Sequence, residues 1–239
     1  MKNLTKMRGH ITISFFLLLP HFLAAQNTEP VLVKAGTRVI DYFPLNERYR
    51  YKDFTEGEAV SKSGTSNSAK FNYNFLSGEM EFIRSADTLI IANKKDVKYI
   101  TVAQDTFYYN NGYLEIIRSG SFRVFVNQNI IIKDIQKEGA FGTINRTAAS
   151  ESYSFLITKG FSNDLVADEN WVLQNTPGYY FSTPAHDYLQ FTRKNILLLL
   201  PAKKDLINKY LKANKVDFKS RDDLIKLADF MDNLMKQGT

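Results

Sequence analysis

The sequence predicts a mainly β fold, in which antiparallel strands form a meander or sandwich-like sheets and a pair of α-helices follows at the C-terminus. Three observations predict it. Short segments of alternating apolar and polar residues recur along the chain, Phe and Tyr are frequent within them, and the alternation gives way to helical periodicity near Pro201. The segments follow one another roughly every ten residues, which leaves no room for crossover helices, so consecutive strands are expected to be antiparallel neighbours.

Residues 1–25 are expected to be a signal peptide. An apolar run over residues 11–23 follows a short segment that has no acidic residue and three basic ones: Lys2, Lys6 and Arg8. The run is shorter than the roughly 20 residues that span a bilayer, and Pro20 interrupts it, so removal is favoured over a retained anchor. Cleavage is predicted after Ala25, and no cysteine follows the run to accept a lipid. The expected location is the periplasm, the outer membrane or the cell exterior, with no transmembrane segment in the mature protein.

The composition excludes several classes of function. Loss of the leader removes three basic residues from 31 and leaves 25 acidic ones in place, so the net charge falls from +6 to about +3. No basic cluster remains that would indicate a nucleic-acid partner. The densest basic stretch, residues 193–215, alternates with apolar residues at helical spacing and is interpreted as the solvated face of a helix. The chain has no cysteine, which excludes thiol nucleophiles, thiolate metal sites and disulfides.

Residues 26–200 are expected to form the β domain, with an internal division in the weakly patterned loop 139–152. The clearest hairpin joins residues 106–109 to 113–117, because Asn111-Gly112 can adopt the positive φ angles of a type I′ turn. The expected strands are residues 37–43, 58–62, 70–75, 79–84, 88–92, 97–103, 106–109, 113–117, 122–127, 130–135, 153–158, 171–175, 178–182 and 188–192.

Residues 201–239 are expected to form a helical hairpin packed on the β domain. The first helix follows Pro201, since proline fits the first turn of a helix. The second begins after Ser220, the predicted N-cap, with Asp223 at the third helical position. Its apolar stripe over residues 224–235 needs a partner surface. Burial of the stripe on the sheet or the first helix is one reading, and docking of an exposed stripe into another protein is the alternative.

The segment 71–83, followed by Asp87-Thr88-Leu89 and by residues 96–100, resembles a family of uncharacterised secreted β-rich proteins from Gram-negative, Bacteroidota-type envelopes. The tail over residues 204–234 is similar to tails in the same group. The resemblance covers about two thirds of the mature chain. It implies an envelope location and a β-rich fold, and it brings no assigned activity or catalytic residue.

Candidate catalytic groups are few. His186 is the only histidine of the mature chain, and no Gly-x-Ser-x-Gly nucleophile motif accompanies it, so it is interpreted as a loop or surface residue. Glu79 and Glu81 would share one face of a strand about 7 Å apart. That separation suits the paired carboxylates of glycoside hydrolases, although two acids are also normal on the wet face of a strand. A carboxylate-based hydrolase acting on envelope glycans is therefore the alternative function.

No metal or cofactor site is predicted. One histidine and no cysteine do not suit zinc or copper. Asn163-Asp164 and Asp168-Glu169-Asn170 offer oxygen ligands for calcium, but the Asp-x-Asp-x-Asp-Gly pattern is missing, so an Asx-rich turn is favoured.

The aromatic residues carry the leading functional hypothesis, a non-enzymatic binding or interaction module of the envelope. Adjacent strand positions place one ring inside the sheet and its neighbour outside, and outward rings can stack on a glycan or pack against a protein. An envelope protein or a glycan is the expected partner. The candidate contact residues are Tyr49, Tyr51, Tyr108, Tyr109, Trp171, Tyr179 and Tyr180.

N-terminal sequencing of the protein purified from the envelope fraction is expected to begin at Gln26, because the leader has the length and polarity of a cleaved signal. A sequence that starts at Met1 would contradict the predicted export.

Overall fold

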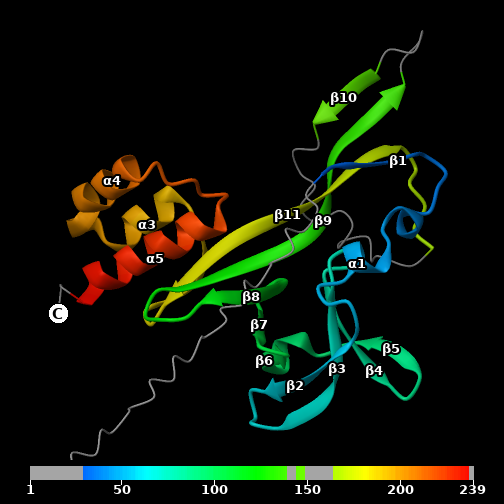
Figure 1. Cartoon of the computed structure of the whole chain (residues 1–239), viewed down its shortest axis with the longest axis horizontal. Coiled ribbons are helices and arrows are strands. Elements are labelled where there is room, and N and C mark those ends of the chain that lie inside the picture. Colours follow the sequence, from blue (N-terminus) through cyan, green and yellow to red (C-terminus); the bar gives the residue numbers. More distant parts are fainter. Residues whose placement is uncertain (1–28, 139–143, 149–163, 237–239) are drawn as a thin grey trace, which may run out of the picture.

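The computed structural model describes residues 29–138, 144–148 and 164–236. Within these ranges twelve strands form one antiparallel sheet in the order β1-β11-β9-β8-β7-β6-β2-β3-β4-β5, while β10 pairs with β9 and β12 with β11 (Figure 1). Helices gather at the C-terminal end of the chain. The mainly β class with C-terminal helices is confirmed. The predicted signal peptide and its cleavage site at Ala25 lie outside the described residues.

The bounds of the elements are as follows. The strands are β1 (Val31–Val33), β2 (Thr55–Ser61), β3 (Ser66–Asn74), β4 (Glu79–Arg84), β5 (Asp87–Ile90), β6 (Val97–Val102), β7 (Asp105–Tyr109), β8 (Tyr113–Arg118), β9 (Arg123–Glu138), β10 (Ile144–Ala148), β11 (Asn170–Thr183) and β12 (His186–Gln190). The helices are α1 (Leu45–Arg48), α3 (Arg193–Leu199), α4 (Lys204–Ala213) and α5 (Arg221–Lys236), with short 3-10 turns η1 (Val39–Tyr42), η2 (Lys94–Asp96) and η4 (Pro201–Lys203).

Two long strands, β9 and β11, run through the whole molecule (Figure 1). They pair from Asn170 opposite Gln136 to Ser182 opposite Arg123, with one register shift between Val172 and Leu173. The sequence predicts a break at Pro177 in this region, and the structure shows none. Neither β1 nor β12 pairs with β11 at Pro177, so the outer edge is open there and a proline removes no ladder hydrogen bond.

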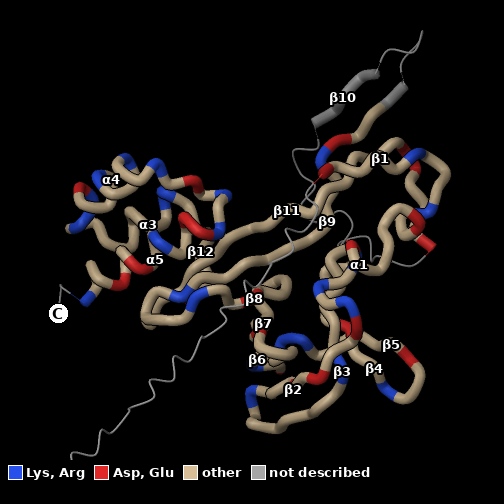
Figure 2. Tube along the Cα trace, viewed as in Figure 1, with Lys and Arg blue, Asp and Glu red and all other residues tan. Residues whose placement is uncertain are grey.

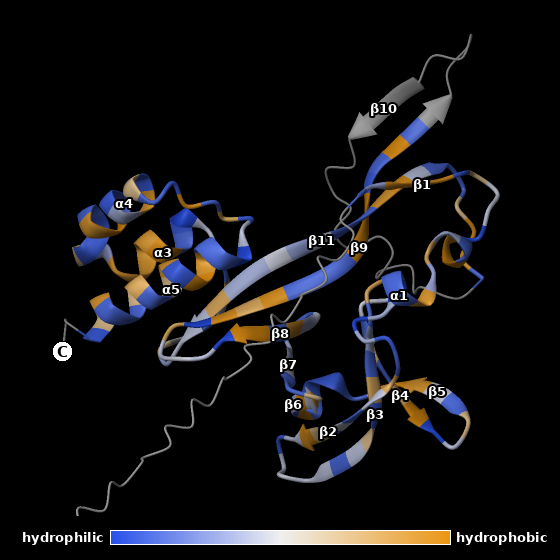
Figure 3. Ribbon diagram, viewed as in Figure 1, coloured by the Kyte–Doolittle hydropathy of each residue, from blue (hydrophilic) through white to orange (hydrophobic). Residues whose placement is uncertain are grey.

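The two ends of the β9–β11 pair carry separate hydrophobic cores. One core lies between the main sheet and the N-terminal segment, and Trp171, Phe75 and Phe107 are among its largest side chains. The other core joins the helices to the end of the pair where β9 begins and β11 ends, around Phe122 and Phe181, whose rings stack with centroids 4.7 Å apart. Figure 3 shows the hydrophobic residues concentrated on the central strands and on the inner sides of α3 and α5. Each core is thus built on a different half of the same two strands.

The helical region begins at α3, before the predicted boundary at residue 201. Thr192 caps α3 by accepting a hydrogen bond from the amide of Asn195 at 3.3 Å. Ser220 accepts one from the amide of Asp223 at 3.3 Å, which confirms it as the cap of α5. Lysines on α4 face solvent while Ile207 is buried, as expected for an amphipathic helix, and Figure 2 shows basic and acidic residues interspersed over this region.

The apolar stripe of α5 is buried against the second core. The docking alternative, which needed an exposed stripe, is therefore wrong. The covering surface comes from the sheet, from the segment before α3 and from the helices α3 and α4, which contribute Ile196 and Ile207. The buried stripe residues are Leu224, Leu227, Ala228, Met231 and Leu234.

Two local predictions differ from the structure. Residues 37–43 were expected to form a strand, and the chain instead forms the 3-10 turn η1 with Val39 and Phe43 buried. Apolar residues four apart suit a helical turn as well as a strand, so a short run cannot decide between them. The predicted 107–117 hairpin is present, but Tyr109 lies opposite Tyr113, so its loop has three residues, with Asn111 at φ 53°. The expected strand 153–158 lies outside the described residues.

Gly57 allows the sheet to curl tightly at β2. A Cβ atom at this position would lie 2.2 Å from the carbonyl oxygen of Thr101 and 3.0 Å from the ring of Phe71. Because only glycine lacks that atom, β2 can pass close to both neighbours.

A buried ion pair attaches α5 to the sheet. Asp232 accepts hydrogen bonds from the Arg118 guanidinium at 2.5 Å and from the amide of Phe122 at 2.6 Å. Arg118 also contacts Asp229 at 2.9 Å, but the side chain of Asp229 is 61% exposed, against 9% for Asp232.

We expect Asp232→Ala to lower the free energy of unfolding by about 3 kcal/mol, because it leaves the buried amide of Phe122 without its acceptor and removes the more buried of the two carboxylates that pair with Arg118. The matched control, Asp229→Ala, removes a solvated contact of the same arginine and should cost less than about 1 kcal/mol. Urea unfolding at pH 7 measures both. Equal losses for the two variants would contradict the assigned role of Asp232.

Candidate functional site

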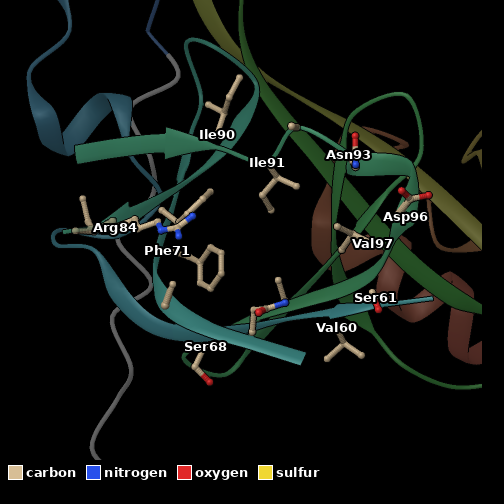
Figure 4. Close-up of a pocket in the computed structure, with 16 residues that line it drawn as sticks. Val60, Ser61, Ser68, Phe71, Arg84, Ile90, Ile91, Asn93, Asp96 and Val97 are labelled. Atoms are coloured by element: carbon tan, nitrogen blue, oxygen red, sulfur yellow. The ribbon is translucent and has the colours of Figure 1, made fainter. Parts of the chain in front are cut away.

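A pocket of about 690 Å³ opens on the inner face of the curled sheet formed by β2, β3, β4 and β5 (Figure 4). We call it the β2–β5 pocket. Its volume falls in the range of small-molecule sites, which is roughly 300 to 1,000 Å³. The residues that line it are Ala59, Val60, Ser61, Asn67, Ser68, Ala69, Phe71, Phe82, Ile83, Arg84, Ile90, Ile91, Ala92, Asn93, Asp96 and Val97.

Strand alternation makes the base of the pocket apolar. Ala69 and Phe71 lie two apart on β3, Phe82 lies opposite Phe71 on β4, and Val97 begins β6. The same residues belong to the first hydrophobic core or pack directly against it. The pocket is therefore the end of that core, left open to solvent where the sheet curls.

The rim of the pocket is partly apolar and exposed. Ile90 on the edge strand β5 lines the pocket and is 53% exposed. β5 pairs with β4 on one side, and no described strand pairs with its other side. An apolar group that entered the pocket would remove this surface from water. Each Å² of apolar surface buried in this way favours binding by about 25 cal/mol.

Polar groups stand at opposite ends of the pocket. In Figure 4 the guanidinium of Arg84 lies beside Phe71 at one end, and Asn93 and Asp96 lie at the other. Arg84 is exposed, and within the described part of the chain it forms no ion pair, not even with Asp87, which lies opposite it in the β4–β5 register. The site is thus an apolar trough with an unpaired cation at one end.

The predicted contact tyrosines do not form one surface. Tyr49 donates its hydroxyl hydrogen to Glu81 at 2.7 Å, and Tyr51 donates to Asp105 at 2.7 Å. Trp171 is 1% exposed and lies in the first core. These three positions hold the fold together and offer little ring surface to a ligand.

Tyr108 and Tyr109 lie on opposite sides of their strand. Tyr108 is half-buried and lies on the face of the sheet opposite the first core. There its ring centroid lies 6.3 Å from that of Tyr99, 5.7 Å from that of Phe125 and 6.4 Å from that of Tyr188. Tyr109 packs on Tyr113 at 5.2 Å. Only Tyr108 therefore joins a group of partly exposed rings, as the binding hypothesis required.

Tyr179 and Tyr180 lie near the helices. Tyr179 lines a second pocket, of about 480 Å³, between β11 and the segment before α5, where Lys133, Phe191 and Lys219 also lie. Tyr180 is half-buried on β11 opposite Phe125. Neither tyrosine reaches the β2–β5 pocket.

The carboxylates of the hydrolase alternative are already engaged. Glu81 is buried and accepts hydrogen bonds from the hydroxyl of Tyr49 and, at 2.8 Å, from the side-chain amide of Asn74. Glu79 forms an ion pair with Lys94. A catalytic pair needs one carboxyl to protonate a leaving group and another to attack or activate water. Both oxygens of Glu81 accept hydrogen bonds, and Glu79 binds Lys94 through one oxygen while its other oxygen is buried without a partner, so neither carboxyl is open to a substrate.

The other candidate groups lie apart from the pocket. The backbone of His186 pairs with Thr183 at the start of β12. Asn170, at the start of β11, accepts a hydrogen bond from the backbone amide of Ala35 at 2.9 Å, which joins two segments far apart in the sequence, while Asn163 lies outside the described residues. Among the described residues no group of three or more His, Cys, Asp or Glu could hold a metal ion.

Beneath the sheet surface, Arg50 binds Glu115 through two hydrogen bonds of 3.0 and 3.2 Å. Burial opposes the charge, but the bonds to Glu115 and the nearby Asp105 outweigh it and raise the pKa of Arg50. All the charged groups of this cluster are paired with one another, which indicates a structural role.

Sequence reasoning missed the pocket because its lining comes from five strands and the segment between β5 and β6, so no single stretch of the sequence carries it. One signal was present. Met80, Phe82 and Arg84 occupy successive inward positions of β4, and the first two are apolar. A cation that ends such a row is unusual for a core strand and marks the place where the core opens.

No protein-family model, curated protein or solved structure matches this chain. No helix within the described ranges combines the length and apolar character needed to cross a membrane.

Buried tyrosines give the protein a defined response to alkali. Burial, more than the nearby Glu79 and Tyr109, raises the pKa of Tyr113, and burial likewise raises the pKa of Tyr73. In the unfolded chain these hydroxyls lose their protons near pH 10. The folded chain therefore holds more protons above pH 10, and its free energy of unfolding falls as the pH rises, by up to about 1.4 kcal/mol per pH unit for each such tyrosine.

We expect Tyr113→Phe to make the free energy of unfolding fall less steeply as the pH rises above 10. The free energy of unfolding at pH 7 should be unchanged or higher, because the Tyr113 hydroxyl is buried with no hydrogen-bond partner. Tyr73→Phe is the matched control, since it also removes the hydrogen bond to Asn129 and should destabilise the protein at pH 7 by about 1 kcal/mol. Urea unfolding at pH 7 and between pH 9.5 and about 11 measures both. A Tyr113→Phe protein as steeply sensitive to alkali as the parent would refute the assignment.

Proposed function

We propose that this protein is an exported, non-enzymatic binding protein of the bacterial envelope that holds an apolar group of its ligand in the β2–β5 pocket. The observation that carries the proposal is the open end of the first hydrophobic core, where Phe71, Phe82 and Ile91 line a trough of about 690 Å³. A domain that needed no ligand would gain stability by closing this end with a larger side chain, since buried apolar area stabilises a fold.

The leader supports the location. Its basic start, short apolar run and small residues at 24 and 25 are those of an export signal, and the resemblance to secreted envelope proteins points the same way. The engaged states of Glu79 and Glu81 support binding over hydrolysis. A protein partner or a glycan was the expected ligand from the tyrosines, and the pocket now favours a ligand with an apolar part.

We expect the purified mature protein to bind N-phenyl-1-naphthylamine, an uncharged probe whose fluorescence rises in apolar surroundings. Ala69→Phe should weaken binding at least about tenfold, because the new ring fills the pocket. Ile90→Asp should also weaken it, and this exposed position tolerates the change without unfolding.

Ala213→Phe is the control, since it makes the same substitution on an exposed position of α4. Fluorescence titration measures all four proteins, and circular dichroism checks that each is folded. Binding that is absent, or that is unchanged in both pocket variants, would remove the proposed function.

A further inference from the structure

Resting on the proposed function, we infer that the β2–β5 pocket binds a free single-chain amphiphile whose head group is an anion, and that Arg84 selects the anion. The inference names the ligand class and its orientation. The aliphatic chain lies along Phe71 and Phe82, and the head group meets the guanidinium at the mouth.

The charge arrangement carries the first step. Arg84 follows Phe82 by two residues on β4, so both side chains point to the same face of the strand. The cation therefore reaches over an apolar surface, with no ion pair inside the described ranges to neutralise it. A guanidinium presents parallel N–H donors that match a carboxylate or phosphate, and its bonds to such anions are stronger than those to neutral groups.

The opposite end of the pocket fixes the orientation. Asp96 lines that end, and its carboxylate repels an anion (Figure 4). A ligand with one anionic end and one apolar chain then has a single favourable direction, with the head group at Arg84. The pocket opens to solvent rather than into a closed cavity, so the charged head stays hydrated while the chain leaves water.

The open edge of β5 is the feature that competes with this assignment. An extended peptide could add a strand there and place alternate side chains in the pocket. That mode needs backbone pairing along β5, which is only four residues long, and it gives the unpaired arginine no role. The two occupants respond differently to the charge of Arg84, and the test uses this difference.

The experiment displaces N-phenyl-1-naphthylamine from the mature protein at pH 7.4 with decanoic acid, kept below the concentration at which it forms micelles, or with 1-decanol, kept below its solubility limit. The two competitors share a chain and differ in charge. Arg84→Gln is expected to raise the decanoate concentration for half-displacement about 3- to 10-fold and to leave that for decanol within about twofold. Lys209→Gln, which removes a positive charge from an exposed position of α4, should change neither.

Asp96→Asn tests the orientation of the ligand, with the head group at Arg84. This variant should bind decanoate more strongly or equally well, and weaker binding would contradict the orientation. Equal responses of decanoate and decanol to Arg84→Gln would overturn the anion assignment while leaving the proposed function intact. Displacement by a peptide of alternating apolar residues but not by decanoate would overturn it in favour of strand addition at β5. Failure of the neutral probe to bind at all would instead remove the proposed function.

Discussion

The long pairing of β9 with β11 is the constraint on which the rest of the structure depends. Each strand contributes to the first core with one half and to the second with the other. Within the described residues, the helices meet the sheet at the end of this pair where β9 begins and at the neighbouring strands β8 and β12, and Arg118 of β8 forms its buried contact with Asp232 there. Because a long antiparallel pair has a fixed register, it also fixes the distance between the two cores.

The first core shows how a binding site can arise without a dedicated element. The sheet curls around its apolar face, and Gly57 lets β2 approach β6 and β3 closely enough for the curl to form. The core fills the space from Trp171 to Phe71 and then ends at the open side of β5. A trough left at the end of a packed core has rigid walls, which reduces the entropy lost when a ligand binds.

Much of the local structure could be predicted from the sequence. The Asn111-Gly112 turn, the Ser220 cap and the amphipathic faces of α4 and α5 depend on residues within a few positions of one another, and the structure contains all of them. The candidate ligand contacts were predicted less well. The frequency of aromatic residues pointed to Tyr49, Tyr51 and Trp171, and these residues instead complete hydrogen bonds or fill the core.

The sequence by itself determined the β class, the change to helix near residue 200 and the expectation of export, because each rests on a composition or a period that neighbouring residues carry. Only the tertiary structure decided which strands are neighbours, which end of the core stays open and that Arg84 stands over it. The reason is that these features join residues far apart along the chain, as the 114 positions between Arg118 and Asp232 illustrate. A local pattern cannot specify such a pairing.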